Sequence, residues 1–133
     1  MSTSALALHG HEFCVIDTSN LFVGTTLEDE LLLLGAGEEA LGRVHSECAP
    51  FGLQPEAGRK LASYSGGEQA IICCLLLMTL LPPTPQRILL VHVLETLSPR
   101  NREKLLRRFA ETLPRAALFT LTFDGPRPLD AHA

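Results

Sequence analysis

The chain has 133 residues, a net charge of −4 at pH 7, and a composition that is 46% hydrophobic and 20% charged. This length and composition exclude a disordered chain and predict one globular domain with its own core. The acidic balance and an aromatic content of 5%, without tryptophan, argue against a generally basic or base-stacking nucleic-acid binder.

The four cysteines form neither a disulfide pattern nor a zinc pattern. No CxxC or Cys-His zinc spacing occurs, and Cys73 and Cys74 lie in an apolar run, where thiols behave as small buried hydrophobes. That run, residues 70–81, is shorter than the roughly 20 residues that span a bilayer. We therefore expect reduced thiols, no metal site, no direct membrane insertion and a cytoplasmic location.

The first elements follow from local patterns. Residues 12–17 are a short apolar run that predicts a buried strand, ended by a Thr-Ser-Asn turn. Thr26 opens a capping-box pattern, so a helix is expected over 27–34, ending at Gly35. Its first turn is acidic, at residues 28–30, where the helix dipole favours negative charge.

The later elements include the strongest strand signal, RILLV, whose apolar run predicts burial on both faces of a parallel sheet. The expected order is a helix over 38–48, a long apolar helix from 66 to 81, a strand over 87–93, a helix beginning at Ser98-Pro99, and a strand over 116–123. These elements predict a single α/β domain over residues 1–133, with a small parallel sheet of about three strands flanked by helices. Residues 1–11 and 125–133 are expected to be flexible.

The most informative motif is Ser65-Gly66-Gly67-Glu68, at the start of the long apolar helix. The two glycines let the backbone approach a ligand closely, and the free amides of a first helical turn attract anions. Together with the serine hydroxyl they suggest a phosphate-binding helix terminus. The structural alternative is an ordinary serine N-cap after a turn.

The order of motifs resembles the ATP-binding cassette (ABC) ATPase family. Its signature, L-S-G-G-Q or L-S-G-G-E, is followed by a long apolar helix, a Walker B strand and a D-loop of the form L-D-P-R-N. Here Ser65-Gly66-Gly67-Glu68 is followed by such a helix, by Ile88-Leu89-Leu90 and by Leu97-Ser98-Pro99-Arg100-Asn101. Residues 20–31 resemble the segment after the Q-loop. The likeness covers about residues 13–124 and implies a P-loop NTPase-like fold.

The chain departs from that family at the positions that handle phosphate, metal and water. No G-x-x-x-x-G-K-[ST] occurs, so the Walker A strand and loop are missing and the resemblance is to a truncated, signature-bearing half. The degenerate positions are Asp17 at the Q-loop glutamine, Val91 at the Walker B aspartate, His92 at the catalytic glutamate, Ser98 at the D-loop aspartate and Phe123 at the switch histidine. His92 is a candidate base; a histidine at the end of a buried strand is the structural alternative.

The resemblance implies a catalytically inactive binding module. It would associate with itself or with a complete P-loop ATPase subunit through its signature helix, offering Ser65, Gly66, Gly67 and Glu68 to ATP held by the partner. No cofactor is expected in isolation. One alternative is an ATPase half-site whose P-loop is supplied in trans, with His92 or Glu95 acting on water. Another is a DNA-repair or chromosome-maintenance accessory protein using the arginines of 100–115, which the acidic total disfavours.

Loss of the first strand has a structural consequence for the sheet. It is expected to leave an exposed edge at the strand over 116–123 and an uncovered helix face. Either feature would favour a homo-oligomer or a complex with another subunit.

Overall fold

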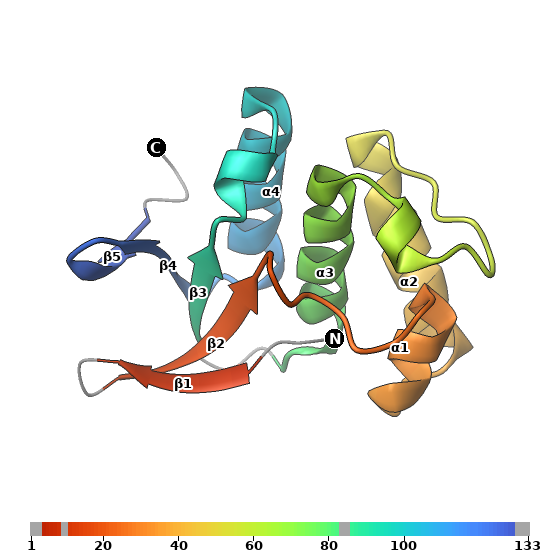
Figure 1. The fold of residues 1–133 in the computed structure, drawn as a ribbon, viewed down its shortest axis with the longest axis horizontal. Coiled ribbons are helices and arrows are strands. Elements are labelled where there is room, and N and C mark those ends of the chain that lie inside the picture. Colours follow the sequence, from red (N-terminus) through yellow and green to blue (C-terminus); the bar gives the residue numbers. More distant parts are fainter. Residues whose placement is uncertain (1–3, 9–10, 83–85, 130–133) are drawn as a thin grey trace.

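Five strands form one sheet in the order β1-β2-β3-β4-β5 in the computed structural model, which describes residues 4–8, 11–82 and 86–129 (Figure 1). The strands are β1 (Ser4–Leu8), β2 (His11–Asp17), β3 (Arg87–Val91), β4 (Ala117–Thr122) and β5 (Gly125–Pro128). The α-helices are α1 (Leu27–Leu33), α2 (Glu38–Cys48), α3 (Gly66–Leu80) and α4 (Pro99–Thr112). Three short 3₁₀ turns, η1 (Ala49–Phe51), η2 (Leu61–Ser63) and η3 (Leu94–Thr96), lie in the connections.

The three strands at the centre of the sheet are parallel. Val15 of β2 is paired with Leu89 of β3, which is paired in turn with Phe119 of β4. The predicted parallel sheet over 12–17, 87–93 and 116–123 is therefore confirmed, although β3 ends at Val91, two residues earlier than expected. Four of the five β3 residues are buried, as its apolar run predicted.

Two antiparallel edge strands were not predicted. β1 pairs with β2, and β5 pairs with β4 through a two-residue turn, Phe123-Asp124. The Thr122 hydroxyl donates to the Gly125 carbonyl over 2.7 Å, and Gly125 has a positive φ of 110°. The expectation that 116–123 is an exposed edge is therefore wrong. Residues 4–8 and 125–128, expected to lie outside regular structure, are strands.

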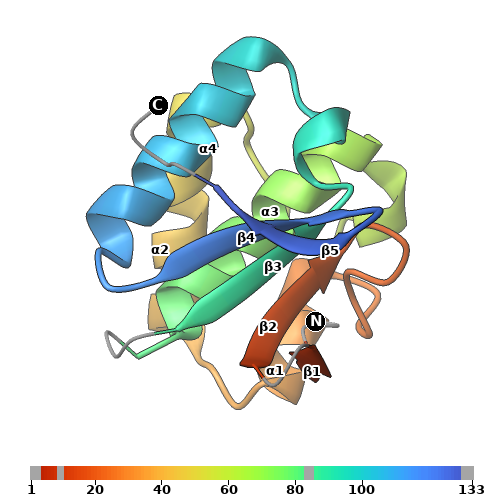
Figure 2. The ribbon, with the colours of Figure 1, turned by 90° about the vertical axis from the view of Figure 1, so that its left-hand side faces the viewer.

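All four helices lie on one face of the sheet, as Figures 1 and 2 show from two sides. The expected sheet flanked by helices is thus covered by helices on one side alone. The reason is the strand order: β2, β3 and β4 follow one another in the same direction, so equivalent crossovers return on the same face. The helix-free face carries a small buried cluster in which the Phe13 and Phe119 rings meet edge to face, 5.0 Å apart.

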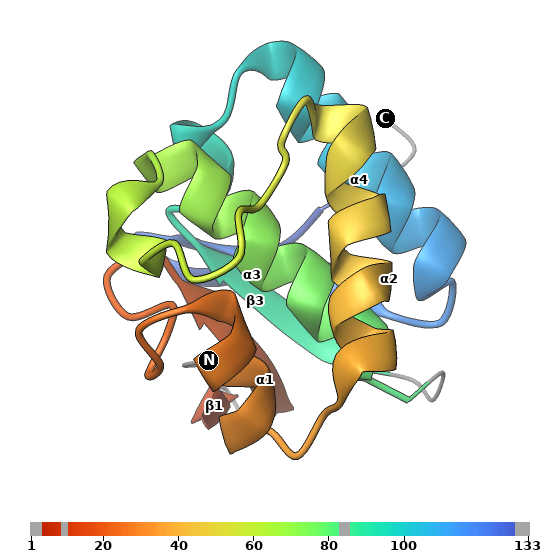
Figure 3. The ribbon, with the colours of Figure 1, turned by 90° about the vertical axis from the view of Figure 1, so that its right-hand side faces the viewer.

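Helix α3 packs against both α2 and α4, and Figure 3 views this helical layer from the side away from the sheet. Every residue from Ala70 to Met78 is buried, so this helix has no solvent face over most of its length. Such a helix is stabilised by burial around its whole circumference rather than by an amphipathic stripe. With 15 residues it is the longest described helix, and no described helix is long and apolar enough to cross a membrane.

The predicted helix ends are confirmed. The Thr26 side chain accepts a hydrogen bond from the Asp29 amide, and Gly35, after the last turn of α1, has a φ of +73°. Ser98 caps α4 by accepting from the Asn101 amide over 3.2 Å, with proline at the first helical position. These local signals depend on residues a few positions apart, which is why the sequence reveals them.

Candidate functional site

The Ser65–Glu68 segment forms a complete capping box at the start of α3. The Ser65 hydroxyl accepts from the Glu68 amide over 3.1 Å, and the Ser65 amide donates to Glu68 Oε1 over 2.9 Å. The preceding residue, Tyr64, is buried, and its hydroxyl accepts from the Glu56 amide. The helix therefore begins at a fixed place, and Ser65 is the N-cap that the sequence analysis gave as the structural alternative.

The two glycines of the motif have different surroundings. A Cβ on Gly67 would lie 2.8 Å from the Thr96 carbonyl oxygen, so the fold itself requires glycine there. A Cβ on Gly66 would meet nothing within 4 Å, and this residue is exposed without a positive φ. Within the described part of the chain, the amides of both glycines have no hydrogen-bond partner. The packing of the fold accounts for Gly67 but leaves Gly66 unexplained.

A cavity of about 290 Å³ lies beside this corner. Two helix N-termini border it, because Ser65 and Gly67 come from the start of α3 while Ser98 and Asn101 come from the start of α4. The structure thus brings Ser98 to the same cavity as the Ser65 motif. Both helices have the positive ends of their dipoles here, whereas Glu68 contributes a carboxylate to the same wall.

Asp17 and Val91 end neighbouring parallel strands and are paired in the register. Asp17 Oδ1 accepts from the amide and the hydroxyl of Ser19, at 2.9 and 2.8 Å. Val91 is buried in the sheet and offers no polar group. Phe123 is fully exposed at the tip of the β4–β5 turn. Neither Asp17 nor Phe123 lines the cavity beside Ser65.

His92 follows β3 with a φ of +60° and is the only non-glycine residue with positive φ in the described ranges. Its Nδ1 lies 2.8 Å from Glu95 Oε2, and both side chains are mostly exposed. Within the described residues, Nδ1 is therefore engaged with a carboxylate while Nε2 has no hydrogen-bond partner. The backbone thus leaves the extended conformation of β3 at His92, and the His92 side chain pairs with the carboxylate of Glu95, three residues later.

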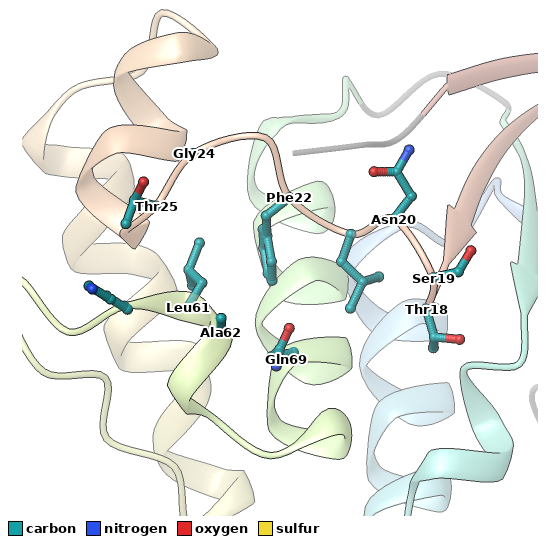
Figure 4. Close-up of a pocket in the computed structure, with 11 residues that line it drawn as sticks. Thr18, Ser19, Asn20, Phe22, Gly24, Thr25, Leu61, Ala62 and Gln69 are labelled. Atoms are coloured by element: carbon teal, nitrogen blue, oxygen red, sulfur yellow. The ribbon is translucent and has the colours of Figure 1, made fainter.

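A second, larger cavity, of about 380 Å³, lies after β2 and was not predicted (Figure 4). Its walls are the 18–25 loop, the 60–62 segment and Gln69 of α3. In Figure 4 the Phe22 side chain lies between Leu61 on one side and Asn20 on the other. The one sequence signal was the polar turn Thr18-Ser19-Asn20, which indicated a turn without indicating a cavity.

Buried Glu30 positions that loop. Its side chain is fully buried, and its carboxylate accepts from the Val23 amide over 3.1 Å and the Gly24 amide over 2.6 Å. A Cβ on Gly24 would lie 2.8 Å from the Glu30 backbone nitrogen. Helix α1 thus contacts the 18–25 loop that precedes it through the Glu30 carboxylate. Residue 24 must be glycine, because its α-carbon lies close to the Glu30 backbone.

The buried thiols are poor nucleophiles. Burial raises the pKa of Cys73 to about 12 and that of Cys74 well above its ordinary value. Burial also raises the pKa of Cys48 to about 12, with a smaller contribution from Glu47. The prediction that Cys73 and Cys74 are buried hydrophobes is confirmed.

Two of the five basic residues of α4, Arg107 and Arg108, form ion pairs. Arg107 contacts Glu103 over 3.0 Å, and Arg108 contacts both Glu47 and Glu111. These acids reduce the positive charge that the helix presents.

Comparison with protein-family models and with curated proteins finds no match for this chain.

Proposed function

We propose that the chain is a catalytically inactive, ABC-ATPase-like binding module that presents the start of α3 to phosphate groups of a nucleotide held by a partner. The Ser65, Gly66 and Gly67 corner would be the anion-facing surface. The partner would be a P-loop ATPase subunit, since the sequence has no Walker A motif of its own. ATP would then be bound in the complex alone.

One observation carries this proposal: Gly66, an exposed residue at the start of a 15-residue helix, has a backbone amide without a hydrogen-bond partner in the described part of the chain. Free amides at a helix N-terminus, with the dipole behind them, bind anionic oxygens. Glu68 already occupies the Ser65 amide, which leaves the two glycine amides for a phosphate. The open space around Gly66 means that packing does not demand a glycine there. A closely approaching ligand would demand one.

The residues at the positions that would activate water or hold a metal support the proposal that this chain is catalytically inactive. Val91 is an apolar, buried side chain where the family has an aspartate. Asp17 is engaged with Ser19, and Phe123 carries no titratable group. A valine cannot orient metal-bound water, so we expect no hydrolysis by this chain alone.

The test begins with the isolated chain. Titration calorimetry with Mg-ATP should detect no binding, because nothing in the sequence cradles the β- and γ-phosphates. The tagged chain should then recover a Walker A-bearing subunit from its native cells when a non-hydrolysable Mg-ATP analogue is present, and not in its absence. Tight Mg-ATP binding by the isolated chain would overturn the proposal.

The matched variants are Gly66→Asp and Gly66→Asn. Both side chains fit the open space at Gly66, and an acid in the first turn is favourable for the helix, so both should fold. The aspartate should abolish nucleotide-dependent association by repelling phosphate, while the neutral asparagine should reduce it less. Association that is unchanged in Gly66→Asp would refute a role for this corner.

A second candidate is an ATPase half-site with the P-loop supplied in trans. The left-handed His92 and its 2.8 Å contact to Glu95 favour it, because this pairing leaves an exposed imidazole nitrogen available as a base. Phosphate release by the recovered complex should then be lost in His92→Ala. An unchanged rate would exclude His92 from the reaction.

A further inference from the structure

The two edges of the sheet are protected to different degrees. β5 has four residues, of sequence Gly-Pro-Arg-Pro, and ends the sheet on one side. Two prolines lack backbone donors and one arginine is charged, and these are the features by which natural proteins block strand addition at an edge. We expect nothing to pair along β5.

β1 ends the sheet on the other side and has none of these features. Its five residues, Ser4–Leu8, contain no proline and no charge. β2 pairs along one side of β1, and no described strand pairs along the other. Unpaired backbone donors and acceptors along an uncharged strand form a template for a further strand.

The sequence of β1 and its place at the less protected edge point to one occupant. We infer that β1 pairs with β1 of a second copy, antiparallel and about a two-fold axis, to give one continuous ten-stranded sheet.

The sequence of β1 suits pairing with itself. Ser-Ala-Leu-Ala-Leu is nearly symmetric about Leu6: a two-fold axis there sets Leu6 opposite the partner's Leu6, and Ala5 opposite the partner's Ala7. In a two-fold symmetric contact, each residue meets either the same residue of the second copy or the residue equally far from the axis on the other side. No like charges oppose one another in this register, so self-pairing meets no electrostatic penalty.

This surface is separate from the start of α3. In Figures 1 and 2, β1 lies at the lower edge of the sheet, below the start of α3. The inference therefore does not depend on the proposed nucleotide-facing corner. A contact along one five-residue strand is small compared with a standard interface, so we expect a reversible dimer that dissociates on dilution.

Sedimentation velocity on the 133-residue chain over a concentration series tests this pairing. The wild type should shift from monomer to dimer as concentration rises. Leu6→Lys and Leu6→Glu should each be monomeric, because like charges then face each other across the axis. An equimolar mixture of the two variants should restore the dimer. Leu121→Lys, a charge added at an exposed position of β4, is the control and should dimerise as the wild type does.

Several results would overturn the inference: a wild type that is monomeric throughout, dimers in both Leu6 variants, or a mixture that stays monomeric. A dimer that survives the Leu6 changes but is lost in Gly66→Asp would assign self-association to α3 instead. Hydrogen exchange of the wild type gives a readout without mutation: amides of residues 4–8 should gain protection with concentration, while those of β5 should not. An equal change in amide protection at β1 and β5 as concentration rises would contradict the pairing through β1.

Discussion

The amide of Gly24 donates a 2.6 Å hydrogen bond to the fully buried carboxylate of Glu30. The same carboxylate accepts from Val23, so a helical side chain replaces water for two backbone donors of the preceding loop. That loop forms one wall of the larger cavity. The geometry of the cavity wall is thus set by a single acid in the first turns of α1.

Replacing Glu30 should destabilise the protein and loosen this loop. Glu30→Ala leaves the Val23 and Gly24 amides without their acceptor, and an orphaned buried donor costs about 1–3 kcal/mol. Urea denaturation should show a loss of about 2 kcal/mol or more in the free energy of unfolding, with faster hydrogen exchange over 18–25. Asp29→Ala, at an exposed position of the same helix, should cost less than about 1 kcal/mol. Equal losses in both variants would contradict the role assigned to Glu30.

The two signature glycines should respond differently to alanine. Gly67→Ala forces a Cβ to within 2.8 Å of the Thr96 carbonyl oxygen, so η3 or α3 must shift, at a cost of about 1–3 kcal/mol. Gly66→Ala enters open space and should be neutral or slightly stabilising, since alanine is the better helix former. Thermal and urea denaturation of the two variants gives the comparison directly. Equal stability would show that the Thr96 contact relaxes freely.

The left-handed backbone at His92 predicts an order of stabilities. His92→Val should lower the free energy of unfolding by about 1–2 kcal/mol, because a positive φ is strained for a β-branched side chain. Glycine adopts a φ of +60° without strain, so His92→Gly should stay within about 1 kcal/mol of the wild type. Glu95→Gln, which removes the exposed ion pair, should change stability by less than about 1 kcal/mol. Denaturant unfolding of the three variants tests this order.

The buried thiols predict a loss of stability in alkali. Cys48 and Cys73 have folded-state pKa values of about 12, above the ordinary value of 9.0, so the folded state retains protons that the unfolded state releases. Their contribution is fully present below pH 9 and is lost as pH rises from about 9 towards 12. The slope approaches about 1.4 kcal/mol per pH unit for each group. Unfolding curves measured from pH 8 to pH 11 should show the decline, and Cys73→Ala should flatten it. A pH-independent curve would contradict the burial of these thiols.

Much of the fold could be predicted because its signals are local. The caps at Thr26, Ser65 and Ser98 each involve an amide three residues further along, within one turn. The three central strands were visible as apolar runs bounded by turns. These features depend on neighbouring residues alone, and a single sequence contains them completely.

The remaining features depend on pairing between distant residues or break a local rule. β5 contains two prolines, which argue against a strand anywhere except at an edge, and the position of an edge is a property of the whole sheet. In the sequence, Glu30 is one of three acids in a first helical turn, where the helix dipole favours negative charge. Its partners lie six and seven residues earlier in a loop, and no periodic pattern marks them.

The start of α3 shows the same division. The serine cap was the structural alternative in the sequence analysis, and the structure separates the two glycines by what surrounds them, which the sequence could not do. The function of this corner remains a prediction. It depends on a partner's nucleotide rather than on any contact within the chain.

The strand order has a further consequence, for biosynthesis. Each strand from β2 to β5 lies beside the strand synthesised just before it. No later segment has to insert between two strands that are already paired. A nascent chain could therefore assemble its sheet in the order in which it leaves the ribosome, and a ribosome stalled after β4 would carry a sheet lacking only its last edge.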